Sequence, residues 1–138
     1  MSSAIDTNVL LNLAGGDAGS ARKTAALLER ESRVGGLVVS PLVYAECLAH
    51  PGWKRSDLDT LLRETRIGLD WNLSETVWIS AGTRFATFAN RRRRSEDGQP
   101  RRILADFVIG AHALDLGAII TYDGFFAKYF PELRIIDK

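Results

Sequence analysis

Short apolar runs alternate with longer helical patterns along this chain. The runs cover residues 4–6, 37–39, 67–69, 118–121 and 133–136. Short runs rich in branched apolar residues and bounded by turn residues are typical of strands buried on both faces of a sheet. The sequence therefore predicts five strands, the first of which ends at Asp6 and the fourth of which is the clearest.

The segments between these runs follow a helical period. Helices are expected over residues 7–13, 20–30, 42–49, 58–62, 77–88, 103–116 and 124–130. Ser40 and Pro41 form a strong helix start, because serine caps free N–H groups and proline fits the first turn. Ser56 and Asp59 resemble a capping box for the next helix. Gly117 is a typical residue for the end of the helix that precedes the fourth strand.

Strands that alternate with helices predict an α/β fold with a largely parallel sheet, covered by helices on both faces. Parallel strands need crossover connections, and these are right-handed. In such sheets ligands bind beyond the carboxyl ends of the strands. The chain has 138 residues and no internal repeat, so we expect a single domain over residues 1–138.

The segment Ile103–Leu116 is the most apolar of the predicted helices. Between its start and His112 the only acidic residue is Asp106, so we expect this helix to be buried nearly all round. Gly110 on the same helix is expected to let a neighbouring strand approach. A carboxylate in such a helix is costly unless something pairs with it. One alternative is purely structural: backbone N–H groups at the helix start satisfy Asp106.

Four acidic residues are predicted to converge at one edge of the sheet. Asp6 and Asp123 follow strands, whereas Glu46 and Asp106 are each a single acid in an otherwise apolar helix. Ser40 starts the Glu46 helix at the same edge. Four carboxylates repel one another, and no pattern of lysine or histidine nearby offers to neutralise them. Oxygen ligands suit Mg²⁺ or Mn²⁺, and the scarcity of Cys and His disfavours zinc.

Positive charge is concentrated just before the predicted Asp106 helix. The net charge is only +1, but six arginines lie within twelve residues: Arg91, Arg92, Arg93, Arg94, Arg101 and Arg102. Arginine binds phosphate groups in a bidentate manner, which favours a nucleic-acid backbone as the ligand. The alternative is a solvated helix end, where positive charge is favourable to the helix dipole.

Neither membrane insertion nor secretion is indicated by the sequence. No apolar run approaches the roughly 20 residues that a membrane helix needs, and residues 1–11 lack the basic start of a secretory signal. The single cysteine, Cys47, lies in an apolar run and is expected to be a core residue in a reducing compartment. We therefore expect a cytoplasmic protein with no membrane partner.

Four separated motifs together resemble the PIN-domain family, most closely the VapC-type toxin ribonucleases. They are IDTNVLL at 5–11, SPLVYAECL at 40–48, RRILADFVIGAHAL at 101–114 and TYDGFFAKYFPELRII at 121–136. The resemblance implies a three-layer α/β/α sandwich and RNA cleavage that depends on Mg²⁺ or Mn²⁺. It also implies a VapB-type antitoxin that covers the site, and a homodimer.

The resemblance also assigns roles to residues. The acids of the four motifs correspond to the candidate catalytic residues Asp6, Glu46, Asp106 and Asp123. Asp6 and Asp106 are expected to bind the metal ion directly. The other two are expected to bind it, to hold its water or to belong to the shell of a second metal ion. Four polar neighbours are expected to support these acids through hydrogen bonds: Thr7, Asn8, Ser40 and Thr121. The implied reaction is hydrolysis of an RNA phosphodiester without a covalent enzyme intermediate, with the arginines holding the RNA backbone.

Three other functions compete with this interpretation. A haloacid dehalogenase-like phosphatase needs a second Asp two residues after the first, where this chain has Asn8. A PIN-type module that binds RNA or a partner without cleaving typically loses site acids, and all four are present here. A Ser-His-Asp hydrolase has little support, because His50 and His112 lie in no nucleophile motif.

Overall fold

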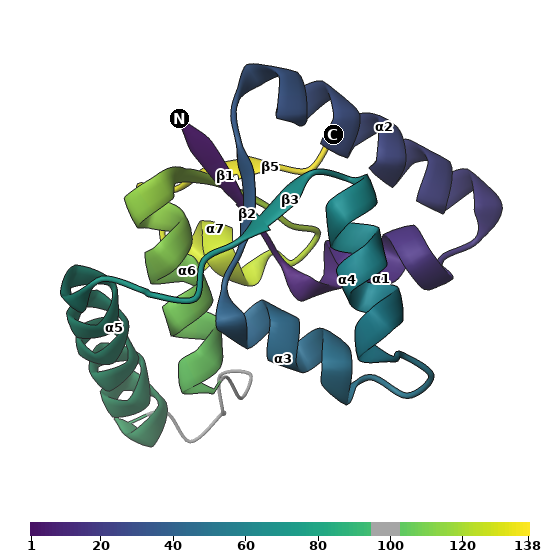
Figure 1. Cartoon of the computed structure of the whole chain (residues 1–138). Helices are drawn as coiled ribbons and strands as arrows, with labels where there is room; N and C mark the ends of the chain where they lie inside the picture. Colours follow the sequence, from purple (N-terminus) through teal and green to yellow (C-terminus); the bar gives the residue numbers. More distant parts are fainter. Residues whose placement is uncertain (95–102) are drawn as a thin grey trace.

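The computed structural model describes residues 1–94 and 103–138, except for the side chains of residues 93 and 94 (Figure 1). Its strands form one sheet in the order β3-β2-β1-β4-β5. They are β1 (Ser2–Ile5), β2 (Leu37–Val39), β3 (Ile67–Leu69), β4 (Gly117–Ile120) and β5 (Arg134–Ile136). Every neighbouring pair is parallel, and Ser3 of the central strand lies in register with Leu37 and Ala118. The predicted α/β class is confirmed.

Helices cover both faces of this sheet. They are α1 (Thr7–Gly15), α2 (Ala18–Val34), α3 (Pro41–Ala49), α4 (Arg55–Glu64), α5 (Glu75–Arg94), α6 (Leu104–Leu116) and α7 (Phe125–Tyr129). Figure 1 shows α1, α2 and α4 on one side of the strands and α5 and α6 on the other, with α3 at the edge where the strands end. The molecule therefore has the three expected layers. In the part of the chain that is described, no helix is both long and apolar enough to cross a membrane.

An aromatic cluster joins α5, α6 and α7. The ring of Phe107 on α6 meets Phe85 of α5 at 5.4 Å and Phe125 of α7 at 5.2 Å between centroids, both edge-on. Edge-to-face pairs of this kind add to the stabilisation from buried area. Gly110 faces the same cluster, since a Cβ there would lie 2.3 Å from a ring carbon of Phe130. The close neighbour of Gly110 is therefore an aromatic side chain rather than the strand that its sequence suggested.

The predicted capping box of α4 is wrong. The helix begins at Arg55, and its N-cap residue Lys54 makes no side-chain cap hydrogen bond, so Ser56 lies inside the first turn. Asp59 instead accepts a hydrogen bond from the Tyr44 hydroxyl at 2.7 Å. A hydrogen bond between α3 and α4 thus replaces the bond predicted within the first turn of α4.

The first turn of α6 is more exposed than its sequence predicts. Ile103 is 62% and Leu104 47% exposed, whereas the residues from Phe107 to Ala113 are buried. Asp106 is consequently half-buried rather than enclosed. Its Oδ2 accepts a hydrogen bond from the Ile103 backbone N–H at 3.3 Å. The alternative in which a backbone N–H at the helix start satisfies Asp106 thus accounts for one of its contacts.

Candidate active site

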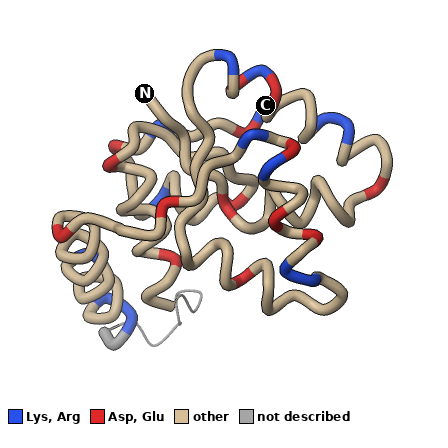
Figure 2. Tube along the Cα trace, in the orientation of Figure 1, with Lys and Arg blue, Asp and Glu red and all other residues tan. Residues whose placement is uncertain are grey.

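The carboxyl edge of the sheet gathers the four predicted acids. Asp6 follows β1 directly and Asp123 follows β4, and these two strands are paired. Glu46 and Asp106 come from α3 and α6, which contact each other, and Figure 2 shows the acidic segments of both helices at this edge. Asp6 interacts electrostatically with Asp106 and Asp123, and Glu46 with Asp6 and Asp106. The edge is therefore a region of concentrated negative charge.

Asp6 is held in place by three donors. Its Oδ1 accepts the Thr7 backbone N–H at 2.8 Å. Its Oδ2 accepts the Thr121 hydroxyl at 2.8 Å and the Asn8 side-chain amide at 2.9 Å. The residue is only 7% exposed. Hydrogen bonds on both oxygens of a buried carboxylate leave it a single orientation.

Thr7 connects Asp6 to Glu46. Its hydroxyl donates to Glu46 Oε1 at 3.0 Å while its backbone N–H donates to Asp6. The first residue of α1 thus orients two carboxylates that belong to different elements. Ser40 acts differently: its hydroxyl accepts the Val43 N–H at 3.2 Å. Ser40 therefore caps α3 and positions Glu46 only through that helix.

Asp123 is placed by the turn between β4 and α7. Its backbone N–H donates to the Thr121 hydroxyl oxygen at 3.0 Å, and its Oδ1 accepts the Phe125 N–H at 2.9 Å. In the same turn the Tyr122 N–H donates to Asn8 Oδ1 at 3.1 Å. Asn8 and Thr121 therefore lie beside the acids, where the sequence predicted them.

The residues present fit a hard divalent cation. Burial is the largest cause of a raised pKa at both Asp6 and Glu46, and repulsion from neighbouring acids adds to it; the hydrogen bonds from Thr121 and Thr7 act in the opposite direction. A cation would offset this repulsion. No three described His, Cys, Asp or Glu side chains already form a group that could hold a metal ion. Mg²⁺, however, commonly binds through one or two carboxylates and keeps several waters.

Comparison with known proteins decides the family. The sequence model of the PIN-domain family matches residues 4–129. The chain belongs to the PIN-domain family. The family resemblance seen in the four sequence motifs is confirmed.

Two solved structures share this PIN fold. VapBC-1 from nontypeable Haemophilus influenzae aligns with a TM-score of 0.66 and 23% identity, over 99% of this chain and 98% of that chain. VapBC2 from Rickettsia felis, bound to a DNA fragment from its promoter, aligns with a TM-score of 0.67 and 16% identity, over 100% and 99% of the two chains. A search of curated proteins finds no match. At these identities the likeness shows a common fold.

Part of the predicted arginine patch belongs to α5 of the PIN domain. Arg91 is exposed and Arg92 half-buried. The side chains of Arg93 and Arg94, and the residues Arg101 and Arg102, lie outside what the structure describes. Figure 1 shows the last turn of α5 beside the first turn of α6, which carries Asp106. The described arginines therefore belong to a helix end that lies near the acidic edge.

Sequence reasoning missed two contacts. Tyr122 joins the site through its backbone bond to Asn8, and its position between two predicted site residues was the available signal. His112 is 2% exposed, and its Nε2 lies 3.1 Å from Asp70 Oδ2. Asp70 lies in a loop after β3, and no local pattern connects it to His112.

Proposed function

We propose that this chain is a VapC-type toxin ribonuclease, which hydrolyses RNA phosphodiester bonds with the help of Mg²⁺ or Mn²⁺. The observation that carries the proposal is the convergence of Asp6, Glu46, Asp106 and Asp123 at the carboxyl edge of a PIN fold. Membership of the family supports it, because PIN domains generally use divalent metal ions.

In this proposal Asp6 and Asp106 bind the ion directly, and Glu46 and Asp123 bind it or hold its water. A bound divalent cation lowers the pKa of a water molecule and offsets negative charge on a phosphoryl oxygen. The chain itself supplies orientation: Thr7 fixes Asp6 and Glu46 together through bonds of 2.8 Å and 3.0 Å. Because these bonds exist before the substrate arrives, the site needs little rearrangement during the reaction.

The proposed partner is a VapB-type antitoxin. The two similar structures are those of VapBC-1 and VapBC2, and their likeness to this chain over nearly its full length supports such a partner. We also propose a homodimer and a cytoplasmic location, which rest on the family resemblance and on the sequence.

The proposal is tested with purified protein on a mixed RNA pool. We expect cleavage with Mg²⁺ or Mn²⁺ and none with EDTA. Asp106→Asn should lower the rate at least about 100-fold, since it removes a charge that the reaction uses. Asp115→Asn is the matched control, because Asp115 is an exposed acid on the same helix, and it should cleave normally.

Each contrary result has a definite meaning. Cleavage that persists in EDTA, or an Asp106→Asn variant with the normal rate, contradicts the metal mechanism. RNA binding without cleavage favours a non-catalytic PIN module. Phosphate release from a small phosphomonoester, with RNA intact, favours the phosphatase.

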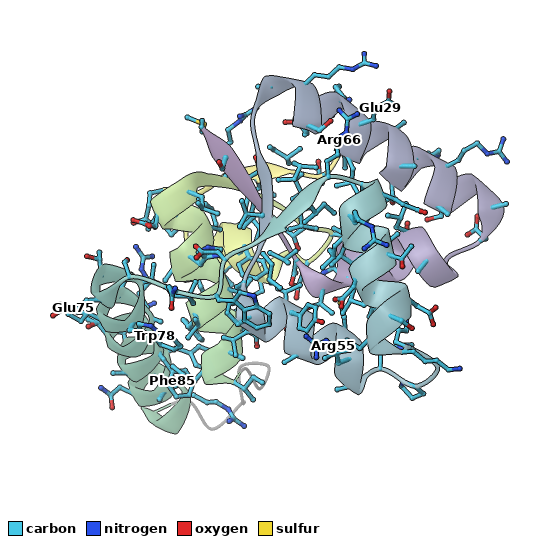
Figure 3. All side chains as sticks on the ribbon, viewed as in Figure 1. Glu29, Arg55, Arg66, Glu75, Trp78 and Phe85 are labelled. Atoms are coloured by element: carbon cyan, nitrogen blue, oxygen red, sulfur yellow. The ribbon has the colours of Figure 1, made fainter. Side chains whose placement is uncertain are left out.

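We further propose that Arg91, Arg92, Arg93, Arg94, Arg101 and Arg102 contact the RNA backbone. Changing residues 91–94 to alanine should reduce the slope of log affinity against log salt by about 0.7 for each lost phosphate contact with single-stranded RNA. A variant with four other exposed arginines of α2 and α4 changed to alanine removes the same four charges and so controls for net charge; they are Arg22, Arg33, Arg55 (labelled in Figure 3) and Arg63. An unchanged slope in the 91–94 variant would show that this run does not touch the RNA.

A further inference from the structure

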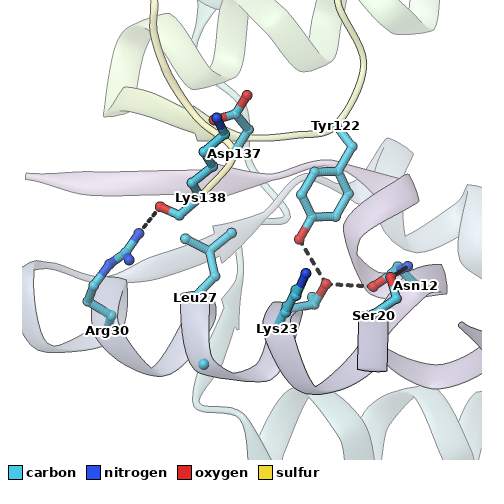
Figure 4. Close-up of a pocket in the computed structure, with 10 residues that line it drawn as sticks. Asn12, Ser20, Lys23, Leu27, Arg30, Tyr122, Asp137 and Lys138 are labelled. Carbon is cyan, nitrogen blue, oxygen red and sulfur yellow. Dashed lines mark hydrogen bonds between the residues drawn. The ribbon is translucent and has the colours of Figure 1, made fainter. Parts of the chain in front are cut away.

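A cavity of about 640 Å³ lies next to the proposed active site, between α2 and the turn that follows β4 (Figure 4). Its walls combine an aromatic ring, an aliphatic side chain, hydroxyls and cations, including Tyr122, Leu27, Ser20, Thr24, Lys23 and Arg30. None of the four candidate catalytic acids lines it. Its volume lies within the range of sites that hold small organic ligands.

Tyr122 connects this cavity to the acidic edge. Its backbone N–H donates to Asn8 Oδ1 at 3.1 Å, and the amide of the same Asn8 donates to Asp6 Oδ2 at 2.9 Å. Figure 4 shows its ring reaching from the turn toward α2, across the cavity. Tyr122 is 45% exposed. Tyr122 directly precedes Asp123 in the chain, so the cavity and the acidic edge share one turn.

A chain of hydrogen bonds fixes the orientation of the Tyr122 ring. The buried Thr24 hydroxyl donates to Asn12 Oδ1 at 2.5 Å. Because this hydroxyl has one proton, its 2.8 Å contact with Tyr122 makes the tyrosine the donor. Asn12 Nδ2 in turn donates to the Ser20 hydroxyl at 2.7 Å. The Ser20 backbone N–H donates to Asp17 Oδ1, but among the described residues the Ser20 hydroxyl only accepts, so the hydroxyl proton is available to a ligand.

The charges of the lining favour an anion. The side chains of Lys23, Arg30 and Lys138 are positive and that of Asp137 is negative. Arg30 is already paired with Glu31 at 3.3 Å, so the phosphate contact depends on Lys23. The Arg30 guanidinium donates to the backbone oxygen of Lys138, which closes one end of the cavity (Figure 4). Lys23 lies farther along this wall than Arg30 and Leu27, below the Tyr122 ring in the view of Figure 4. An aromatic face beside a cation is the combination that binds a base and its phosphate.

We propose that this cavity holds one nucleotide of the RNA strand adjacent to the cleaved bond, an inference that rests on the proposed ribonuclease function. The base lies against Tyr122 and Leu27, the Ser20 hydroxyl donates to the base, and the phosphate lies toward Lys23. The cavity thereby selects which nucleotide stands next to the reacting phosphodiester. An aromatic platform tolerates any base, so the hydroxyl and amide groups of the wall supply the discrimination.

The proposal is tested by binding without cleavage. The probes are four 2′-O-methyl pentanucleotides, each of a single base, titrated in EDTA into ¹⁵N-labelled protein. We expect the amide signals of Lys23, Thr24 and Tyr122 to shift, with at least one base bound about 10-fold more tightly than the others. No shift at these amides with any of the four probes overturns the proposal.

Two pairs of variants localise the effect. Ala26→Trp fills the cavity from α2, whereas Ala25→Trp places the same bulk on the same helix but outside the cavity; both alanines are exposed. Lys23→Glu and Arg22→Glu make the same change of charge, and only Lys23 lines the cavity. We expect at least about 10-fold weaker binding for Ala26→Trp and Lys23→Glu and less than about 2-fold for their partners.

The outcomes separate this inference from the proposed function. If wild-type protein cleaves RNA but Ala26→Trp binds all four probes normally, the cavity is not a nucleotide site and the ribonuclease proposal stands. If the probes bind in the cavity but no RNA is cleaved with Mg²⁺ or Mn²⁺, the nucleotide site stands and the catalytic proposal fails.

Discussion

Glu46 and Asp6 show how single side chains prepare this site. Both carboxylates have pKa values raised mainly by burial, and the hydrogen bonds that each accepts only partly compensate. Thr7 donates to both, so neither can turn away from the other without losing a bond. Side chains held in an unfavourable electrostatic arrangement are typical of sites where function rather than stability determines the residue.

Removing the charge of Glu46 is expected to stabilise the protein in EDTA at pH 7. Glu46→Gln keeps an oxygen that accepts the Thr7 hydroxyl and removes the repulsion from Asp6 and Asp106. The gain should stay below about 1 kcal/mol, because Glu46 is partly solvated. The raised pKa means that the folded protein binds the proton more tightly than the unfolded chain does. The loss of stability caused by the Glu46 charge is therefore absent below pH 4.5, the ordinary pKa of glutamate. It develops as the pH rises from there through the raised pKa of the folded protein.

Chemical denaturation between pH 7 and pH 4.5 measures this difference. The difference in free energy of unfolding between wild type and Glu46→Gln should shrink as the pH falls. Glu64→Gln, a change at an exposed acid of α4, should show no such trend. A Glu46→Gln variant that is less stable than wild type at pH 7 would contradict the described electrostatics.

Some residues of the site were predictable and others were not. Asp6 and Asp123 follow apolar strands, and the carboxyl ends of parallel strands meet at one edge; this alone brings them together. The exposure of Ile103 and Leu104 was not predictable, because composition does not show where a helix leaves the core. Tyr122 was missed although it stands between Thr121 and Asp123, because its partners Asn8 and Thr24 both lie far away in the sequence.

At the scale of elements, Arg84 ties α5 to the segment after α7. Its guanidinium makes two bonds to the Glu132 carboxylate, at 2.9 Å and 2.7 Å, and one to the Tyr129 carbonyl at 3.1 Å. It also lies 4.6 Å from the centroid of the Phe130 ring. Since α5 ends in the arginine run, these contacts help to fix where that run begins.

Gly110 and Gly82 give opposite predictions for the same substitution. Gly110→Ala should cost about 1–3 kcal/mol, because its Cβ would overlap the Phe130 ring. Gly82→Ala in α5, where a Cβ meets nothing within 4 Å, should gain up to about 1 kcal/mol from helix propensity. Denaturant unfolding of both variants measures the difference. Equal stabilities would contradict the packing of α6 against Phe130.

Some helix starts are determined by neighbouring residues in the sequence, and others by contacts with a different element. Ser40 was predicted correctly, because its hydroxyl and the proline after it act within the first turn of α3. Ser56 and Asp59 have the right spacing for a capping box, yet Asp59 binds Tyr44 of another helix. Sequence spacing cannot show which of two possible partners an acid takes when the second lies in a different element.

At the scale of the whole molecule, the order β3-β2-β1-β4-β5 creates the site. Strands β2 and β3 lie on one side of β1, and β4 and β5 lie on the other, so the strand order reverses between β1 and β4. Asp6 and Asp123 follow these two strands. Ligands of parallel sheets bind at such a reversal. The fold class followed from the alternating pattern, whereas the strand order needed long-range pairing that no local pattern contains.

In the proposed mechanism the four acids form one site for a divalent cation. Paramagnetic broadening by traces of Mn²⁺ in the NMR spectrum of ¹⁵N-labelled protein tests it most directly, with Asp6→Asn as the variant. We expect the amide signals around Asp6, Glu46, Asp106 and Asp123 to broaden first in wild type and Asp6→Asn largely to lose the effect. Broadening elsewhere, or the same broadening in Asp6→Asn, would contradict it.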